Sequence, residues 1–262
     1  MKMNIPIYQV DAFAKEAFSG NPAAVCPLDN WLPDEIMQSI AEENNLAETA
    51  FFVKEKEGYR IRWFTPSTEV KLCGHATLAT GYVLFNIIGV DMDIIDFESL
   101  SGPISVLKTD DLYTLNFPID QLMPSSCPIE FRESLGHSPV KTFKGESDYL
   151  LIYENQSVVE SLNPDFNTLS KVDCRGCIVS APGHDFDVVC RGFFPQSGID
   201  EDPATGSAQT TLAAYWPEQL GKTEYSACQL SDRKGFFRTS VKDDRVFISG
   251  ECRLYLKGEI LV

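Results

Sequence analysis

Basic residues are scarce in this chain. Its 22 lysines and arginines face 38 aspartates and glutamates, which gives a formal net charge of −16 and an isoelectric point near 4.5. A surface with this charge repels nucleic acid phosphates, and no basic stripe offsets the repulsion. The chain also lacks a phosphate-cradling glycine-rich loop and a dinucleotide fingerprint. We therefore expect no nucleic acid partner.

An export signal and a cysteine framework are also missing. Residues 1–8 lack the basic start and apolar run of a signal peptide and enter strand-like sequence directly. The eight cysteines follow no framework spacing, so we expect reduced thiols and a cytoplasmic protein. Cys174 and Cys177 have C-x-x-C spacing, but no second pair or histidine lies nearby, so no metal site is predicted.

The longest segment without Asp, Glu, Lys or Arg is Leu72–Val90. Its length suits a membrane span, but polar residues and three glycines interrupt it, and basic flanks are missing on one side. A helix that is apolar on all faces is also typical of the centre of a domain. We favour this buried helix and expect no membrane partner.

The remaining pattern predicts an α+β protein. Its 262 residues, with 44% hydrophobic and 23% charged, can form one large domain or two ordinary ones. Many strand-like segments and few helical ones recur in two similar halves. The looser stretch Pro118–Pro128 marks the boundary, which gives an N-terminal half, residues 1–120, and a C-terminal half, residues 121–262. The last strand can return to the first half.

A short acidic loop, residues 200–205, leads into a predicted helix in the second half. Asp202 is a natural capping residue, and Pro203 suits the first helical turn. Gly206 and Ser207 follow in that turn, where backbone amides have no partner inside the helix. Such a turn attracts a carboxylate or a phosphate.

The first half repeats this layout. Cys73-Gly74-His75-Ala76 matches Thr205-Gly206-Ser207-Ala208 position by position, and each copy follows an aromatic pair, Trp63-Phe64 or Phe193-Phe194. Two helix N-termini in related halves suggest that both face one ligand.

Four residues of the first half are candidates for chemistry or binding. Glu48 lies in an otherwise uncharged strand, where burial would raise its pKa, or it faces water at the strand start. His75 is either a neutral proton donor and acceptor at a helix N-terminus or a structural histidine. Cys73 has no matching thiol, because its counterpart is Thr205, so a small buried residue is favoured. Asn21 lies in a turn from which it could reach a ligand.

In combination, these motifs resemble the phenazine-biosynthesis PhzF-like isomerase family over nearly the whole chain. The matching stretches are Val10–Phe13, Phe18–Val25, Leu46–Phe51, Arg62–Pro66, Cys73–Thr77 and Glu201–Ala208. The resemblance implies two similar domains, each a barrel-like β-sheet around a central α-helix, as in diaminopimelate epimerase. It also implies an active site in the cleft between the halves, no metal or organic cofactor, and a homodimer.

The resemblance also assigns roles to individual residues. The family's catalytic residues fall on Glu48, His75, Asp202 and Ser207. Gly74 and Gly206, with Thr205, Cys73 and Asn21, would surround the substrate. Diaminopimelate epimerase has its second thiol at the position of Thr205, so this chain departs from two-thiol racemisation.

Three hypotheses follow for the function. The first is a cofactor-independent isomerase, in which Glu48 moves a proton between carbons of a small carboxylate-bearing metabolite. The second is a two-base epimerase or racemase of an amino or hydroxy acid that uses Cys73 or His75. The third is a non-catalytic metabolite-binding module, which would have no need of all four catalytic-type residues.

Overall fold

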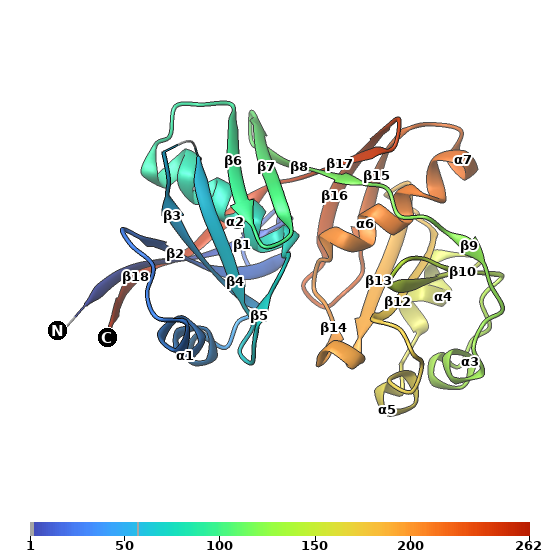
Figure 1. The fold of residues 1–262 in the computed structure, drawn as a ribbon. Helices are drawn as coiled ribbons and strands as arrows, with labels where there is room; N and C mark the ends of the chain where they lie inside the picture. Colours follow the sequence, from blue (N-terminus) through green and yellow to red (C-terminus); the bar gives the residue numbers. More distant parts are fainter. Residues whose placement is uncertain (1–2, 57) are drawn as a thin grey trace. The chain divides into compact units, whose positions relative to one another are not determined.

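A computed structural model describes residues 3–56 and 58–262 of the chain. Met1 and Lys2, which open the segment expected to enter a strand directly, and Glu57 lie outside the described residues. The chain divides into two compact units (Figure 1). The first contains Met1–Asn116 and Ser249–Val262, and the second contains Phe117–Ile248. The last strand therefore lies with the first unit.

The first unit is a mixed sheet with two helices. Its strands are β1 (Asn4–Ala12), β2 (Asn21–Leu28), β3 (Glu48–Lys54), β4 (Tyr59–Phe64), β5 (Glu69–Val70), β6 (Ile94–Ser99), β7 (Gly102–Thr109), β8 (Leu112–Pro118, which runs into the second unit) and β18 (Cys252–Leu261). Hydrogen bonding gives the order β18-β1-β2-β3-β4-β6-β7-β8. The β2–β3 and β4–β6 pairs are parallel and the other pairs are antiparallel.

Helix α2 (Gly74–Val83) is the centre of this unit, and a π-helical turn, η1 (Leu84–Ile88), continues it. It contacts β1, β2, β3, β7 and β18, so the sheet curves around it (Figure 1). The buried hydroxyls of Thr77 and Thr80 donate to the carbonyls of Cys73 and Ala76 at 2.6 and 2.8 Å. Polar residues are thereby accommodated in a helix that is buried almost throughout.

The helix predicted over Leu72–Val90 is therefore present but shorter, because its last part becomes the π-helical turn and ends at Gly89 with φ 79°. Within the described residues, no helix has both the length and the apolar character needed to cross a membrane.

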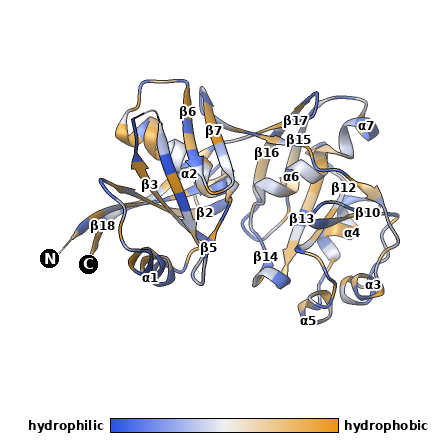
Figure 2. Cartoon of the chain, in the orientation of Figure 1, coloured by the Kyte–Doolittle hydropathy of each residue, from blue (hydrophilic) through white to orange (hydrophobic). Residues whose placement is uncertain are grey.

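Helix α1 (Asp34–Asn44) covers another part of the sheet, against β3 and β4. Its apolar face, formed by Met37, Ile40 and Ala41, packs with Phe51 and Phe64 in one buried cluster. Its other face is acidic, and Figure 2 shows the helix as largely hydrophilic. This is the amphipathic pattern expected of a helix that covers a sheet.

The second unit has more short elements than the first. Its strands are β9 (Met123–Pro124), β10 (Lys141–Lys144), β11 (Asp148–Ile152), β12 (Gly176–Pro182), β13 (Val188–Phe194), β14 (Ile199–Glu201), β15 (Glu224–Gln229), β16 (Gly235–Lys242) and β17 (Arg245–Gly250). Its helices are α3 (Ile129–Leu135), α4 (Gln156–Ser161), α5 (Phe166–Leu169), the 3-10 turn η2 (Pro195–Ser197), α6 (Gly206–Ala213) and α7 (Trp216–Leu220).

Strand pairing shows that the two units share one topology. In the first unit β2 is parallel to β3, β3 antiparallel to β4, β4 parallel to β6, and β6 antiparallel to β7. The same succession in the second unit is β11, β12, β13, β15 and β16. Helix α6 takes the place of α2 in this order and contacts β11 and β16. The predicted α+β fold of two similar sheets, each with a central helix, is confirmed.

Candidate active site

Glu48 is the first residue of β3, and His75 is the second residue of α2. The Nε2 atom of His75 lies 3.1 Å from Oε2 of Glu48, and the two side chains are 8% and 12% exposed. Parallel β2 places Ala23 beside Glu48. Asn21, two residues earlier, therefore lies on the same face of the sheet as Glu48. The structure thus places Glu48 next to His75 and puts Asn21 on the same face of the sheet in the first unit.

Cys73 completes this group. It occupies the N-cap position of α2, and its Sγ lies 3.5 Å from Nδ1 and 3.9 Å from Nε2 of His75. One ligand atom from each of Glu48, Cys73 and His75 lies within 4.8 Å of the other two. We refer to these three residues as the acid–base cluster.

The electrostatics of the cluster correct two sequence predictions. Burial opposes ionisation of Glu48, but the charge of His75 and hydrogen bonds from His75 and Cys73 outweigh it, so the pKa of Glu48 lies below its ordinary 4.5. Burial likewise opposes the imidazolium, yet Cys73 and Glu48 raise the pKa of His75 well above 6.5. The raised pKa expected for Glu48 and the neutral His75 were therefore wrong, because each residue stabilises the charge of the other.

The thiol of Cys73 is not activated by its place at the helix N-terminus. Burial, followed by the charge of Glu48, raises the pKa of Cys73 to about 11. The thiol therefore stays protonated near neutral pH, in keeping with the small buried residue expected there.

A different group surrounds the start of α6 in the second unit. Asp148, which is 3% exposed, accepts hydrogen bonds from Nε of Arg175 at 2.8 Å and from Nη2 of the same residue. Nη2 of Arg175 also donates to Oγ of Ser207 at 3.1 Å, and the Arg175 side chain is 41% exposed. We call Asp148, Arg175 and Ser207 the arginine cluster. It places a guanidinium beside the helix N-terminus, where an anion would be favoured.

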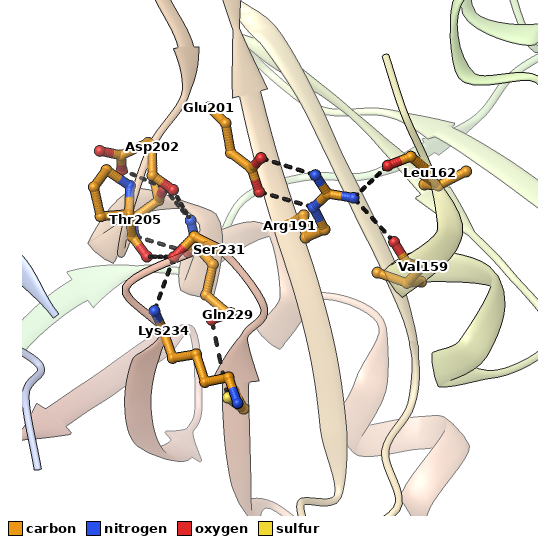
Figure 3. Close-up of polar contacts among 11 residues, drawn as sticks. Val159, Leu162, Arg191, Glu201, Asp202, Thr205, Gln229, Ser231 and Lys234 are labelled. Carbon is orange, nitrogen blue, oxygen red and sulfur yellow. Dashed lines mark hydrogen bonds and ion pairs between the residues drawn. The ribbon is translucent and has the colours of Figure 1, made fainter. Parts of the chain in front are cut away.

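The loop before α6 is fixed by Asp202, Thr205 and Gln229 (Figure 3). The hydroxyl of Thr205 donates to the Asp202 carboxylate. Gln229 accepts from the Thr205 amide at 2.8 Å and donates to the Asp202 carbonyl at 2.6 Å. Helix α6 begins at Gly206, and Thr205 occupies the N-cap position. The predictions that Asp202 caps this helix and that Pro203 lies in its first turn were therefore wrong.

Each loop that leads to a central helix is also held by an arginine–glutamate fork. Arg62 donates to both oxygens of Glu69 at 2.7 and 2.8 Å, and Arg191 donates to both oxygens of Glu201 at 2.8 Å (Figure 3). Glu69 precedes Cys73 by four residues, and Glu201 precedes Thr205 by four residues. The forks extend the internal repeat beyond the four residues recognised in the sequence.

The position equivalent to Glu48 in the second unit carries no side chain. Glu48 is the first residue of β3, and Gly176 is the first residue of β12, the strand that takes the place of β3 in the second unit, so Gly176 is its counterpart by position in the strand. A Cβ at Gly176 would lie 2.3 Å from Cδ1 of Phe194 and 2.4 Å from the Phe193 carbonyl oxygen. A second carboxylate therefore has no room at this position.

The predicted site residues thus form two groups, one in each unit. Gly74, with Cys73 and His75, begins α2, and Gly206, with Thr205 and Ser207, begins α6. Two further residues were missed. Arg175 was considered only as part of a C-x-x-C spacing, and its charge next to the start of β12 was a usable signal. Gln229, at the end of β15, had no signal in its local sequence.

Comparison with known proteins identifies the family. A family model described as phenazine biosynthesis-like protein matches residues 10–258. This chain belongs to that family. A relative named as an uncharacterised isomerase of Pseudomonas aeruginosa is 47% identical and covers 98% of this chain and 99% of its own. The predicted membership of the PhzF-like isomerases is confirmed.

Solved structures place the PhzF-like chain in a wider fold group. A PhzF-family protein from Enterococcus faecalis has a TM-score of 0.96 at 46% identity, and the match covers 98% of this chain and 99% of that one. A hydroxyproline epimerase from Agrobacterium vitis has a TM-score of 0.62 at 10% identity, over 99% of this chain and 93% of that one. The second likeness shows the fold alone.

Proposed function

We propose that this PhzF-like protein is a cofactor-independent isomerase that moves a proton between carbons of a small carboxylate-bearing substrate. The observation that carries the proposal is the buried Glu48 carboxylate, 3.1 Å from His75 at the start of α2. Its lowered pKa keeps it ionised at neutral pH, the state needed to accept a proton.

In the proposed reaction, Glu48 takes a proton from one carbon, and the bonding electrons move into an adjacent unsaturated system. The Glu48 carboxyl then returns the same proton to a second carbon on the same face, so atoms and charge balance over the cycle. The imidazolium of His75 holds the carboxylate in position and stabilises its charge between turnovers. A single base is sufficient for a same-face shift.

The second unit is proposed to bind the substrate carboxylate. Ser207 and the Gly206 amide lie in the first turn of α6, and Arg175 adds a charge-assisted donor beside them. Gly74 offers similar amides in α2. Asp202 holds Thr205 in place, and its predicted part in proton transfer is retained as a proposal. We further propose that both units act on the same substrate molecule.

The two-base alternative gains little support. Thr205 stands where a second thiol would be needed, and Gly176 stands where a second glutamate would be. Cys73→Ala tests this alternative directly, because an epimerase that depends on the thiol loses turnover in that variant.

A homodimer is proposed as the assembly. Leu254, Tyr255 and Leu256 are consecutive exposed apolar residues of β18, and Tyr255 contacts the exposed ring of Phe18. An exposed apolar run of this kind is typical of an interaction surface. Light scattering of the wild type and of Tyr255→Lys would show whether a dimer forms and whether this strand maintains it.

The experiment that tests the isomerase is metabolite capture followed by solvent-deuterium exchange. Small carboxylates retained by purified Glu48→Gln are identified by mass spectrometry and offered to the wild type in D₂O. We expect carbon-bound deuterium with the wild type and none above background with Glu48→Gln. Full incorporation by the variant would remove Glu48 as the base.

A further inference from the structure

The acid–base cluster also has the composition of a transition-metal site. Glu48, Cys73 and His75 supply a carboxylate, a thiol and an imidazole within 4.8 Å of one another. These are the three ligand types that Zn²⁺ takes in proteins. The proposed proton transfer uses Glu48 and His75 but gives the Cys73 thiol no task. The thiol adds a ligand that zinc favours to the two residues used for proton transfer.

The spacing of the three ligand atoms is close to that of a tetrahedral site. Zinc bonds of about 2.3 Å to sulfur and about 2.0–2.2 Å to nitrogen and oxygen place neighbouring ligand atoms about 3.3–3.6 Å apart. In the cluster, His75 Nε2 lies 3.1 Å from Glu48 Oε2 and 3.9 Å from Cys73 Sγ. One separation is slightly short and the other slightly long, and the third, between Glu48 and Cys73 Sγ, lies within 4.8 Å. Side-chain movements would bring all three atoms around one ion.

We propose that the acid–base cluster binds a divalent zinc-class cation through Glu48 Oε2, Cys73 Sγ and His75 Nε2. Three protein ligands leave the fourth tetrahedral position open to water or to an anionic ligand. The ion replaces the thiol proton and the imidazolium proton, which are released to solvent. It acts as a competing ligand and not as a cofactor. The competition rests on the proposed function, because the ion occupies the oxygen with which Glu48 would accept a proton. The binding of the ion does not depend on the proposed function.

Co²⁺ is a suitable probe because it takes tetrahedral thiolate sites and reports on them by its absorption. The purified full-length protein is treated with a chelator and a reductant, exchanged into buffer at pH 8, and titrated with Co²⁺. We expect one equivalent to give a near-ultraviolet thiolate-to-cobalt charge-transfer band and the visible bands of tetrahedral cobalt. Zn²⁺ added afterwards should abolish both. Absence of the charge-transfer band at excess Co²⁺ would overturn the proposal.

Matched variants assign the ligands. Cys73→Ser, which changes one atom, should lose the charge-transfer band, whereas Cys174→Ser should keep it with an affinity within about twofold of the wild type. His75→Asn should weaken binding by at least about 100-fold, since even partners outside the ligand shell contribute about 10- to 100-fold. Circular dichroism checks the fold of each variant. An unchanged band in Cys73→Ser would contradict the site.

The metal and isomerase proposals fail separately. Deuterium exchange by Glu48→Gln would contradict Glu48 as the base, but it would not bear on the cobalt bands of the wild type. Loss of the bands in Cys174→Ser contradicts the metal site and leaves the exchange assay unaffected.

Discussion

The two units place different charged pairs on one topology, Glu48 with His75 in the first and Asp148 with Arg175 in the second. In the first, the start of β3 supplies Glu48, which pairs with His75 in the first turn of α2. In the second, the residue before β12 is Arg175, which donates to Ser207 in the first turn of α6. His75 and Ser207 are equivalent in the repeat, so similar backbones support a carboxylate–imidazole pair in one unit and a guanidinium–hydroxyl pair in the other.

The difference between the units comes down to a few side chains. Gly176 leaves the Glu48 position empty in the second unit, because a Cβ there would meet Phe194 and the Phe193 carbonyl. Thr205 replaces Cys73 and donates to Asp202 instead of contacting an imidazole. These differences support the proposal that the first unit transfers the proton and the second binds the substrate carboxylate.

The largest expected effect separates these two roles. Glu48→Gln should lower kcat by about 100- to 10,000-fold, the usual contribution of a general acid–base group, with little change in substrate affinity. Arg175→Met should mainly raise KM, because it removes a donor to the carboxylate but no base. Steady-state kinetics on the captured substrate measure both. Equal losses of kcat in the two variants would contradict the division of roles.

Some of the residues that distinguish the two units could be predicted from the sequence, and others could not. The repeated Gly74 and Gly206 segments and the uncharged helix were visible because adjacent residues carry the pattern. Glu48 was also named as a candidate, but its charge state was not predicted. The ionisation of Glu48 depends on His75, which follows it by 27 residues and becomes a neighbour only through the packing of α2 on the sheet. Gln229 was missed for the same reason, whereas the charge of Arg175 next to the start of β12 was a local signal that was not used.

The fold was predicted better than its short elements. Many strands were expected because apolar alternation marks the longer ones, and β4 is one of these. The missed elements include β5, β9 and β14, which have only two or three residues, and α4, which has six. Elements of this length are stabilised by pairing and packing with distant segments and carry little local signal.

A second effect concerns pH and the acid–base cluster. Because the pKa of Glu48 is lowered, its contribution to stability is present above 4.5 and is lost as pH falls through the folded-state pKa. Because the pKa of His75 is raised, its contribution is present below 6.5 and is lost as pH rises toward and through the folded-state pKa.

Urea unfolding of the wild type and of Glu48→Gln/His75→Gln, both in chelator, measures this effect. The difference in free energy of unfolding should be most favourable to the wild type between pH 4.5 and 6.5. It should decline on either side with a limiting slope of about 1.4 kcal/mol per pH unit for each group. A difference that does not vary with pH would show that the two side chains do not perturb each other.

A third effect compares the two arginine–glutamate forks. Arg191 also donates to the carbonyls of Val159 and Leu162, at 3.2 and 2.7 Å, within the buried core of its unit. The additional partner of Arg62 is Asp34, a largely exposed carboxylate that water can solvate. Arg191→Met should therefore cost about 3 kcal/mol of unfolding free energy and Arg62→Met about 1–2 kcal/mol. Arg238→Met, at an exposed position of β16, is the control and should stay within about 0.5 kcal/mol.

The smallest effect concerns the eighth residue of each central helix, which is Gly81 in α2 and Ala213 in α6. A Cβ at Gly81 would lie 2.7 Å from Cγ1 of Val106 on β7, so Gly81→Ala should destabilise the protein by about 1–2 kcal/mol through overpacking. Val106→Ala in the same chain removes the opposing methyl groups and should restore much of that loss, although it costs packing when made alone. The double-mutant cycle, measured by urea unfolding, should give a favourable coupling energy. If the losses in unfolding free energy from Gly81→Ala and Val106→Ala simply add, the close contact between α2 and β7 does not require a glycine. Gly81 would then not explain a difference between α2 and α6.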